Sequence, residues 1–186
     1  MTLRALRPWL TVAGTAALLV VTVLVTSARL PTRPVNRLAQ GSVSCEPEEL
    51  PRQQFGSHLI GDRPPPVPYS STPPTSGWHA SGRLAIAINP PDRPLPEPQQ
   101  VSILEAGGVV VTYRQLSELD RRRLETHVRD RFPGRVAVTS YDKLEPGRVA
   151  FTAWGVLQRC DVLDLAVLDN FVAAHAAAHA AIPGAH

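Results

Sequence analysis

The sequence predicts an α+β fold, in which an N-terminal transmembrane helix precedes one small, loop-rich domain with a few-stranded sheet and two helices. Residues 8–28 carry no charge and match the roughly 20 apolar residues that cross a bilayer. Further along, short β-branched apolar runs alternate with two segments of helical periodicity. The 19 prolines among 186 residues are about twice the ordinary share, which favours long ordered loops between these elements.

Residues 1–28 are interpreted as a membrane anchor. The uncharged run is longer than the 7–15 apolar residues of a cleaved signal peptide, although Thr26-Ser27-Ala28 resembles a weak cleavage site, so both fates of the N-terminus stay open. Residues 29–44 are rich in Arg and Pro and read as a linker. Because the N-terminal segment resembles a signal anchor, we expect a single-pass protein of the cell membrane with its C-terminal domain outside the cytoplasm.

The globular domain is expected over residues 45–173, followed by an Ala/His-rich tail at 174–186. Apolar β-branched runs predict its strands, which are residues 84–88, 108–113, 136–139 and 148–154. Residues 101–106 fit either a strand or a helix.

Two helices are predicted from apolar residues at helical spacing. The first covers residues 116–132, is capped by Ser117, and has the inward stripe Leu116, Leu119, Leu124 and Val128. The second begins at Asp161 or Asp164, and its inward stripe is Leu165, Leu168 and Val172, continued by His175 and His179.

Charge and cysteine content limit the function classes. The net charge is +3, but acidic neighbours balance the Arg121–Arg123 run, so no nucleic-acid partner is predicted. Cys45 and Cys160 lack the CxxC spacing of zinc or thioredoxin sites. They form a disulfide if the domain lies outside the cytoplasm, or they remain two independent thiols.

The loop Tyr69–His79, with the sequence YSSTPPTSGWH, is the most distinctive stretch. Its two prolines fix their own φ and force extended backbone before them, and Gly77 permits a positive φ. Trp78 then offers a buried anchor and His79 a titratable donor or acceptor. We expect this rigid loop to hold the His79 side chain in place.

Together with LEAGGVVVTY and FTAWG further along, this loop resembles the bacterial domain of unknown function family 3105. The first block of the family matches Tyr69, Pro73, Pro74, Ser76, Gly77 and His79, and an upstream histidine matches His58. The second block, Val-His-x-Leu-Glu-His-Gly, matches Val101, Leu104, Glu105 and Gly107, while Ser102 and Ala106 replace both histidines. The third block matches Ala153, Trp154 and Gly155. The resemblance implies a membrane-anchored small domain.

Three hypotheses about function follow. Because two family histidines are absent, the first is a non-catalytic binding or interaction module with no named cofactor or protein partner. The second is an extracytoplasmic copper or zinc protein that uses His58, His79 and Glu105, since imidazole suits both metals; His175 and His179 form a further i, i+4 pair. The third is a cell-envelope enzyme, for which the sequence offers no complete catalytic constellation. Convergence of His58, His79 and Glu105 is the observation that separates them.

Overall fold

The computed structural model describes residues 44–61, 63–82 and 84–176. These residues form an α+β domain, the class that the sequence predicts. It has three helices and two small sheets, where two helices and one few-stranded sheet were expected. The expected anchor at 1–28, nearly all of the linker and His179 lie outside the described residues. Within the described ranges, no helix is long and apolar enough to span a membrane.

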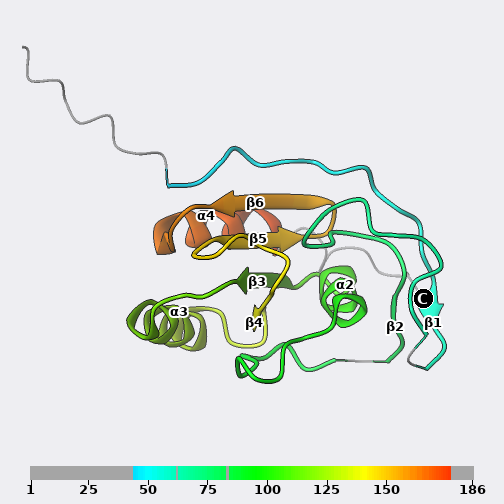
Figure 1. Cartoon of the computed structure of the whole chain (residues 1–186), viewed down its shortest axis with the longest axis horizontal. Coiled ribbons are helices and arrows are strands. Elements are labelled where there is room, and N and C mark those ends of the chain that lie inside the picture. The colour runs from blue at the N-terminus through cyan, green and yellow to red at the C-terminus, as the bar shows by residue number, and fades with distance from the viewer. Residues whose placement is uncertain (1–43, 62, 83, 177–186) are drawn as a thin grey trace, which may run out of the picture. The chain divides into compact units, whose positions relative to one another are not determined.

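The larger sheet has four strands in the order β4-β3-β5-β6 (Figure 1). Their bounds are β3 Val109–Tyr113, β4 Val136–Ser140, β5 Val149–Ala153 and β6 Val156–Cys160. β3 pairs with β4 in parallel, and β5 pairs with both β3 and β6 in antiparallel fashion. The residues of β3 and β5 are all buried, which explains why these strands read as continuous apolar runs.

The helices cover both faces of this sheet. α3 (Glu118–Arg131) and α4 (Leu165–His175) pack in one core cluster with alternate residues of β3, among them Val109 and Val111. α2 (Glu97–Glu105) packs against Val110 on the opposite face. This division follows from the two-residue period of a strand, which sends successive side chains to opposite faces.

The predicted helix caps are present. The Ser117 hydroxyl accepts a hydrogen bond from the Asp120 amide at 3.0 Å. Asp164, one of the two proposed starts of the last helix, accepts from the amides of Ala166 and Val167 at 3.0 and 3.1 Å. Both caps satisfy amides that a helix leaves unpaired in its first turn.

Some expected element boundaries were wrong. Residues 84–88 form no strand beyond a single bridge between Ile88 and Val138. β6 was missed because Gln158 and Arg159 interrupt its apolar sequence. Residues 101–105 of the ambiguous segment belong to α2 and Ala106 is its C-cap, and the helix residues from Gln100 to Leu104 are all buried. A helix buried on this many sides shows no polar stripe, so periodicity could not identify it.

On α3, the predicted inward position of Leu119 is also wrong, because 65% of this residue is exposed. Leu124 and Val128 of the same stripe are buried as expected.

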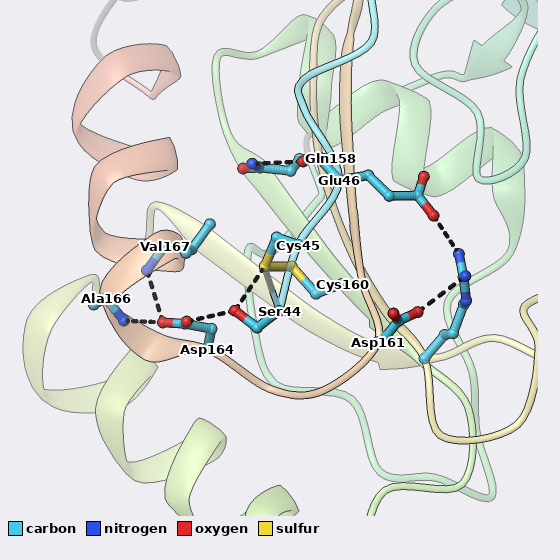
Figure 2. The surroundings of a disulfide bond; sticks show 10 residues. Ser44, Cys45, Glu46, Gln158, Cys160, Asp161, Asp164, Ala166 and Val167 are labelled. Carbon is cyan, nitrogen blue, oxygen red and sulfur yellow. Dashed lines mark hydrogen bonds and ion pairs between the residues drawn. A yellow bond between two sulfur atoms is a disulfide. The ribbon is translucent and has the colours of Figure 1, made fainter. Parts of the chain in front are cut away.

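Cys45 and Cys160 form a disulfide (Figure 2). It closes a loop with a sequence separation of 115, for which the chain-entropy model gives a stabilisation of roughly 4–5 kcal/mol. Around the bond, the amides of Glu46 and Glu49 donate to β6 carbonyls at 2.7 Å. The start of the described chain thereby covers the β6 edge, and Ser44 donates to Asp164 at 2.7 Å.

The smaller sheet has two parallel strands of two residues each, β1 (His58–Leu59) and β2 (His79–Ala80). They lie side by side, away from β5 and β6 (Figure 1). α2 contacts both β2 and β3, so this helix links the small sheet to the large one.

Candidate functional site

The small sheet places two histidines next to each other. His58 of β1 and His79 of β2 are direct partners in the parallel register. Their ring centroids lie 4.7 Å apart, with the ring planes at 74°. Since paired strand residues project to the same side, the backbone pairing itself brings together two imidazoles that are 21 positions apart in the sequence.

Side-chain to backbone hydrogen bonds hold the Tyr69–His79 loop against the segment before β1. The Gln54 amide accepts from the Ser70 backbone at 2.9 Å and donates to the Pro68 carbonyl at 2.8 Å. The Gln54 backbone N–H donates to the Ser76 hydroxyl at 2.9 Å. Neither Gln54 nor its role was found from the sequence, because no local pattern marks a glutamine that bridges two loops.

Within the loop, the Tyr69 hydroxyl donates to the Trp78 carbonyl at 2.6 Å. Burial, with the charge of Glu97 adding to it, raises the pKa of Tyr69, so the hydroxyl keeps the proton that it donates. The loop residues Thr75, Ser76 and His79 are almost fully buried. These hydrogen bonds hold the loop that carries His79 and give the first motif tyrosine a positioning role, whereas Trp78, expected as a buried anchor, is only partly buried.

Gly56 explains how closely the two segments approach. A Cβ atom at this position would lie 2.2 Å from the Gly77 carbonyl carbon and 2.3 Å from the Trp78 nitrogen. Gly77 itself has a φ of 118°, which L side chains rarely adopt. The two glycines together permit the backbone contact that sets the position of β1 beside β2.

The His79 ring is held in one orientation, and 2% of the residue is exposed. Its Nδ1 lies 2.9 Å from the Gly77 carbonyl oxygen. A carbonyl only accepts hydrogen bonds, so Nδ1 carries the proton, and in the neutral ring Nε2 carries the lone pair. A backbone carbonyl bound to the second ring nitrogen is the arrangement that orients metal-ligating histidines.

The other nitrogen of His79 faces a carboxylate. Nε2 lies 2.8 Å from Oε2 of Glu105, the last residue of α2. This close approach lacks hydrogen-bond alignment, because buried Nε2 has no hydrogen-bond partner among the residues described. A lone pair beside a carboxylate is unfavourable unless the two share a cation, which can be a proton or a metal ion.

One ligand atom from each of His58, His79 and Glu105 lies within 4.8 Å of the others. In tetrahedral zinc sites, bonds of about 2.0–2.2 Å place neighbouring ligand atoms about 3.4 Å apart. The longest separation would therefore close by roughly 1.4 Å around such an ion. His58 and Glu105 are exposed, so their side chains have room to make this adjustment toward the fixed His79.

Ser102 and Ala106, where the resemblance leads us to expect histidines in the family, lie on the side of α2 that carries Glu105. Residues three and four apart share one face of a helix, so Ser102 neighbours both Glu105 and Ala106. The Ser102 hydroxyl donates to the carbonyl of Ala80, the residue after His79, at 2.7 Å. Position 102 is therefore next to β2, and a histidine there would lie beside the three-residue cluster.

All three motif blocks meet around the small sheet of β1 and β2, which we call the β1–β2 corner. The amide of Gly155, in the turn between β5 and β6, donates to the Thr75 carbonyl at 2.9 Å. Glu105 from the second block contacts His79 from the first. Gly155 has a φ of 73°, and a Cβ atom there would lie 2.4 Å from the Gln53 side chain. Much of the motif therefore serves to assemble the corner.

The other candidate residues lie outside the cluster. The Nε2 atom of His175 is 3.1 Å from a Glu48 carboxylate oxygen, and the His175 ring contacts Phe171 with centroids 4.6 Å apart. The predicted use of His175 as an added ligand thus finds no support, and its expected partner His179 is not described. Cys45 and Cys160 are engaged in their disulfide.

The site and fold define a small disulfide-linked α+β domain with a His-His-Glu cluster. A family model described as "Protein of unknown function (DUF3105)" matches residues 62–185. The chain belongs to this family, which confirms the relationship expected from the three sequence blocks. The match includes His79 and Glu105 and begins after His58. No curated protein and no solved structure matches the chain.

Proposed function

We propose that this protein is an extracytoplasmic, membrane-tethered binding module whose ligand is a divalent copper or zinc ion held by His58, His79 and Glu105. The observation that carries the proposal is the buried Nε2 of His79. It faces the Glu105 carboxylate at 2.8 Å without an aligned hydrogen bond. A metal ion bound by both atoms would satisfy them at once, once the exposed Glu105 side chain moves out from 2.8 Å to the ligand spacing of about 3.4 Å.

The donor set favours these metals on chemical grounds. Two imidazoles and one carboxylate form a ligand set found in catalytic zinc sites, and imidazole also suits Cu(II), whereas Cu(I) prefers thiolates and thioethers. Three protein ligands leave one coordination position for water or another ligand. Since His58 and Glu105 are exposed, the bound ion would stay accessible from solvent, which suits exchange of the metal better than permanent storage.

The proposed location rests on two supports. The disulfide between Cys45 and Cys160 is typical of proteins outside the reducing cytoplasm. The uncharged run at residues 8–28 has the length of a membrane span. A tether of this kind would keep the metal-binding domain at the outer surface of the cell membrane.

Metal titration of the full-length chain tests the proposal. Isothermal titration calorimetry with Zn(II) and Cu(II) is expected to give one site per chain. His79→Ala removes the one buried, pre-oriented ligand and is expected to abolish binding at this site. Glu105→Gln keeps the side-chain size but removes a charged ligand, and should weaken affinity by at least about 10- to 100-fold, the loss caused by removing a mere hydrogen-bond partner of a ligand.

His175→Gln is the matched control, because it removes a histidine that lies outside the cluster. This variant is expected to bind like the unaltered chain. Equal affinity of the His79→Ala variant and the unaltered chain would overturn the proposal.

A further inference from the structure

A cavity separate from the proposed metal site, which we call the strand-end pocket, lies where the parallel strands β3 and β4 end. It has a volume of about 630 Å³, within the 300–1,000 Å³ range of small-molecule sites. Tyr113 and Ser140 form the last pair of the two strands. They line the pocket together with the residues that follow each strand. Ligands of sheets with parallel strands commonly bind at such carboxyl ends.

Another part of the pocket lining is held in place by hydrogen bonds. It consists of the proline-rich loop before α2, including Pro91, Pro94 and Leu95. The Leu95 amide donates to the Thr139 hydroxyl at 2.7 Å, and the Ser140 hydroxyl donates to the Pro91 carbonyl at 3.0 Å. Because prolines restrict the backbone and two hydrogen bonds fix the loop to β4, little ordering is required when a ligand enters.

Some polar groups of the pocket are already paired with each other. Oε1 of Glu97 accepts from the Tyr141 hydroxyl at 2.5 Å and from the Lys143 ammonium at 2.8 Å. Burial first, and then the hydrogen bond to Glu97, raises the pKa of Tyr141. Its hydroxyl therefore stays protonated and continues to donate to Glu97. The Glu97 and Lys143 charges compensate each other within the protein.

Two other charges that line the pocket lack such partners. Arg114 follows β3 and Asp142 follows β4. Across the residues that the structure describes, neither takes part in an ion pair. Arg114 is held by one nitrogen, which donates to the Leu144 carbonyl at 2.8 Å, so its remaining donors are available. The pocket thus offers one cation and one carboxylate to a ligand.

The backbone next to Arg114 is unusual as well. Gln115 has a φ of 55°, a left-handed conformation that non-glycine residues rarely adopt. Such residues occur preferentially at ligand sites, where the surrounding structure maintains them. Gln115 also lines the pocket.

From these features we propose that the strand-end pocket binds a small zwitterion of the amino-acid type, with the ligand carboxylate on Arg114 and the ligand ammonium on Asp142. The guanidinium fork suits a carboxylate, and the carboxylate of Asp142 accepts from an ammonium. Leu95 and the prolines provide apolar surface for the ligand side chain. A free amino acid and the ends of a short peptide share this chemistry, and the proposal is independent of the metal site.

Calorimetric titration of the full-length chain with L-leucine and with tri-leucine tests the proposal and separates the two sources. Binding of either zwitterion is expected. N-acetyl-L-leucine lacks the ammonium, and L-leucinamide lacks the carboxylate. If leucine is the ligand, each analogue should bind about 10- to 100-fold more weakly than L-leucine. The reason is that a charge-assisted hydrogen bond contributes about 1.5–3 kcal/mol. Amino- and carboxyl-blocked tri-leucine are the corresponding peptide controls.

Two variants connect binding to the named charges. Arg114→Gln should weaken zwitterion binding while retaining a donor for the Leu144 carbonyl. Asp142→Asn changes an exposed side chain, is therefore expected to leave the fold intact, and should also weaken binding. Asp130→Asn, an exposed substitution on α3, is the matched control and should bind like the unaltered chain.

Binding of neither zwitterion would overturn the proposal. Equal binding of L-leucine and N-acetyl-L-leucine, or unchanged affinity in Asp142→Asn, would overturn it as well, because the pocket would then recognise an anion alone.

Discussion

The four-stranded sheet and the small β1–β2 corner are stabilised in different ways. In the large sheet, strands of five residues pair through backbone ladders and bury Val, Ala and Phe side chains between helices. In the corner, each strand has two residues, and Gln54, Tyr69 and Ser76 anchor the loops through side-chain hydrogen bonds. The sheet tolerates changes of comparable apolar volume, whereas the corner depends on particular polar groups and glycines.

This contrast has a functional consequence. Backbone ladders form with many sequences, so they provide a stable frame without specifying chemistry. The corner holds His79 through the Gly77 carbonyl and through buried loop residues, and this fixes a ring nitrogen toward Glu105. We infer that the sheet provides most of the stability, while the corner provides the proposed metal site.

Phe→Ala substitutions in the two regions give the largest expected difference in the free energy of unfolding. Phe151 of β5 is fully buried and packs against Phe171, with centroids 5.9 Å apart. Phe151→Ala is expected to lower the free energy of unfolding by about 3–5 kcal/mol. Phe55 precedes β1 and is 99% exposed, so Phe55→Ala should change it by less than about 0.5 kcal/mol. Urea unfolding followed by circular dichroism measures both changes. Similar losses of unfolding free energy would contradict the inference that the four-stranded sheet provides most of the stability.

A smaller effect on stability, but a large one on binding, is expected at Gly56. In Gly56→Ala, the new Cβ would meet the Gly77 backbone at 2.2 Å, so β1 must move away from β2. We expect a loss of about 1–3 kcal/mol in the free energy of unfolding and the loss of Zn(II) affinity, because His58 moves with β1.

Gly61→Ala is the control for that change. Gly61 has a φ of 64°, and a Cβ atom at this position would have no heavy atom within 4 Å beyond its chain neighbours. The substitution therefore introduces backbone strain of about 1–2 kcal/mol without a steric clash. Its Zn(II) affinity is expected to remain unchanged. If both glycine variants bind zinc equally well, the close approach of the two segments does not position the metal site.

The smallest effect concerns the cap of α4 and depends on pH. The Ser44 hydroxyl, followed by the Val167 and Ala166 amides, lowers the pKa of Asp164. A lowered folded-state pKa means that the charged carboxylate stabilises the fold above its unfolded pKa of about 3.9. This contribution is lost as the pH falls through the lower folded-state value. Asp164→Asn retains a capping oxygen, so it isolates the effect of the charge.

We therefore expect Asp164→Asn to be less stable than the unaltered chain by about 0.3–1 kcal/mol at pH 7, with the difference disappearing at low pH. Asp164→Ala removes the capping acceptor and should cost about 1 kcal/mol, part of which persists in acid. Urea unfolding at a series of pH values measures the two differences. A difference in unfolding free energy between Asp164→Asn and the unaltered chain that stays the same at every pH would exclude a role for the carboxylate charge.

Local patterns in the sequence were sufficient to predict much of the four-stranded sheet and the helices that cover it. The β-branched run before Tyr113 predicted β3, and Ser117 predicted the start of α3, because strand burial and helix capping depend on neighbouring residues. For α4 the sequence left Asp161 and Asp164 as alternative starts, and Asp164 is the cap. The order of the three motif blocks likewise identified the family. It also named His58, His79 and Glu105 as candidates, without showing that they meet.

Only the tertiary structure determines that His58, His79 and Glu105 lie together. Whether His58 lies opposite His79 depends on the register between two distant loops, which is set by Gln54 and the contact between Gly56 and Gly77. Glu105 reaches them because α2 packs between the small sheet and β3, although the burial of α2 removed the periodic signal of a helix. Sequence patterns report interactions over a few residues, whereas a site built from three separate segments depends on long-range packing.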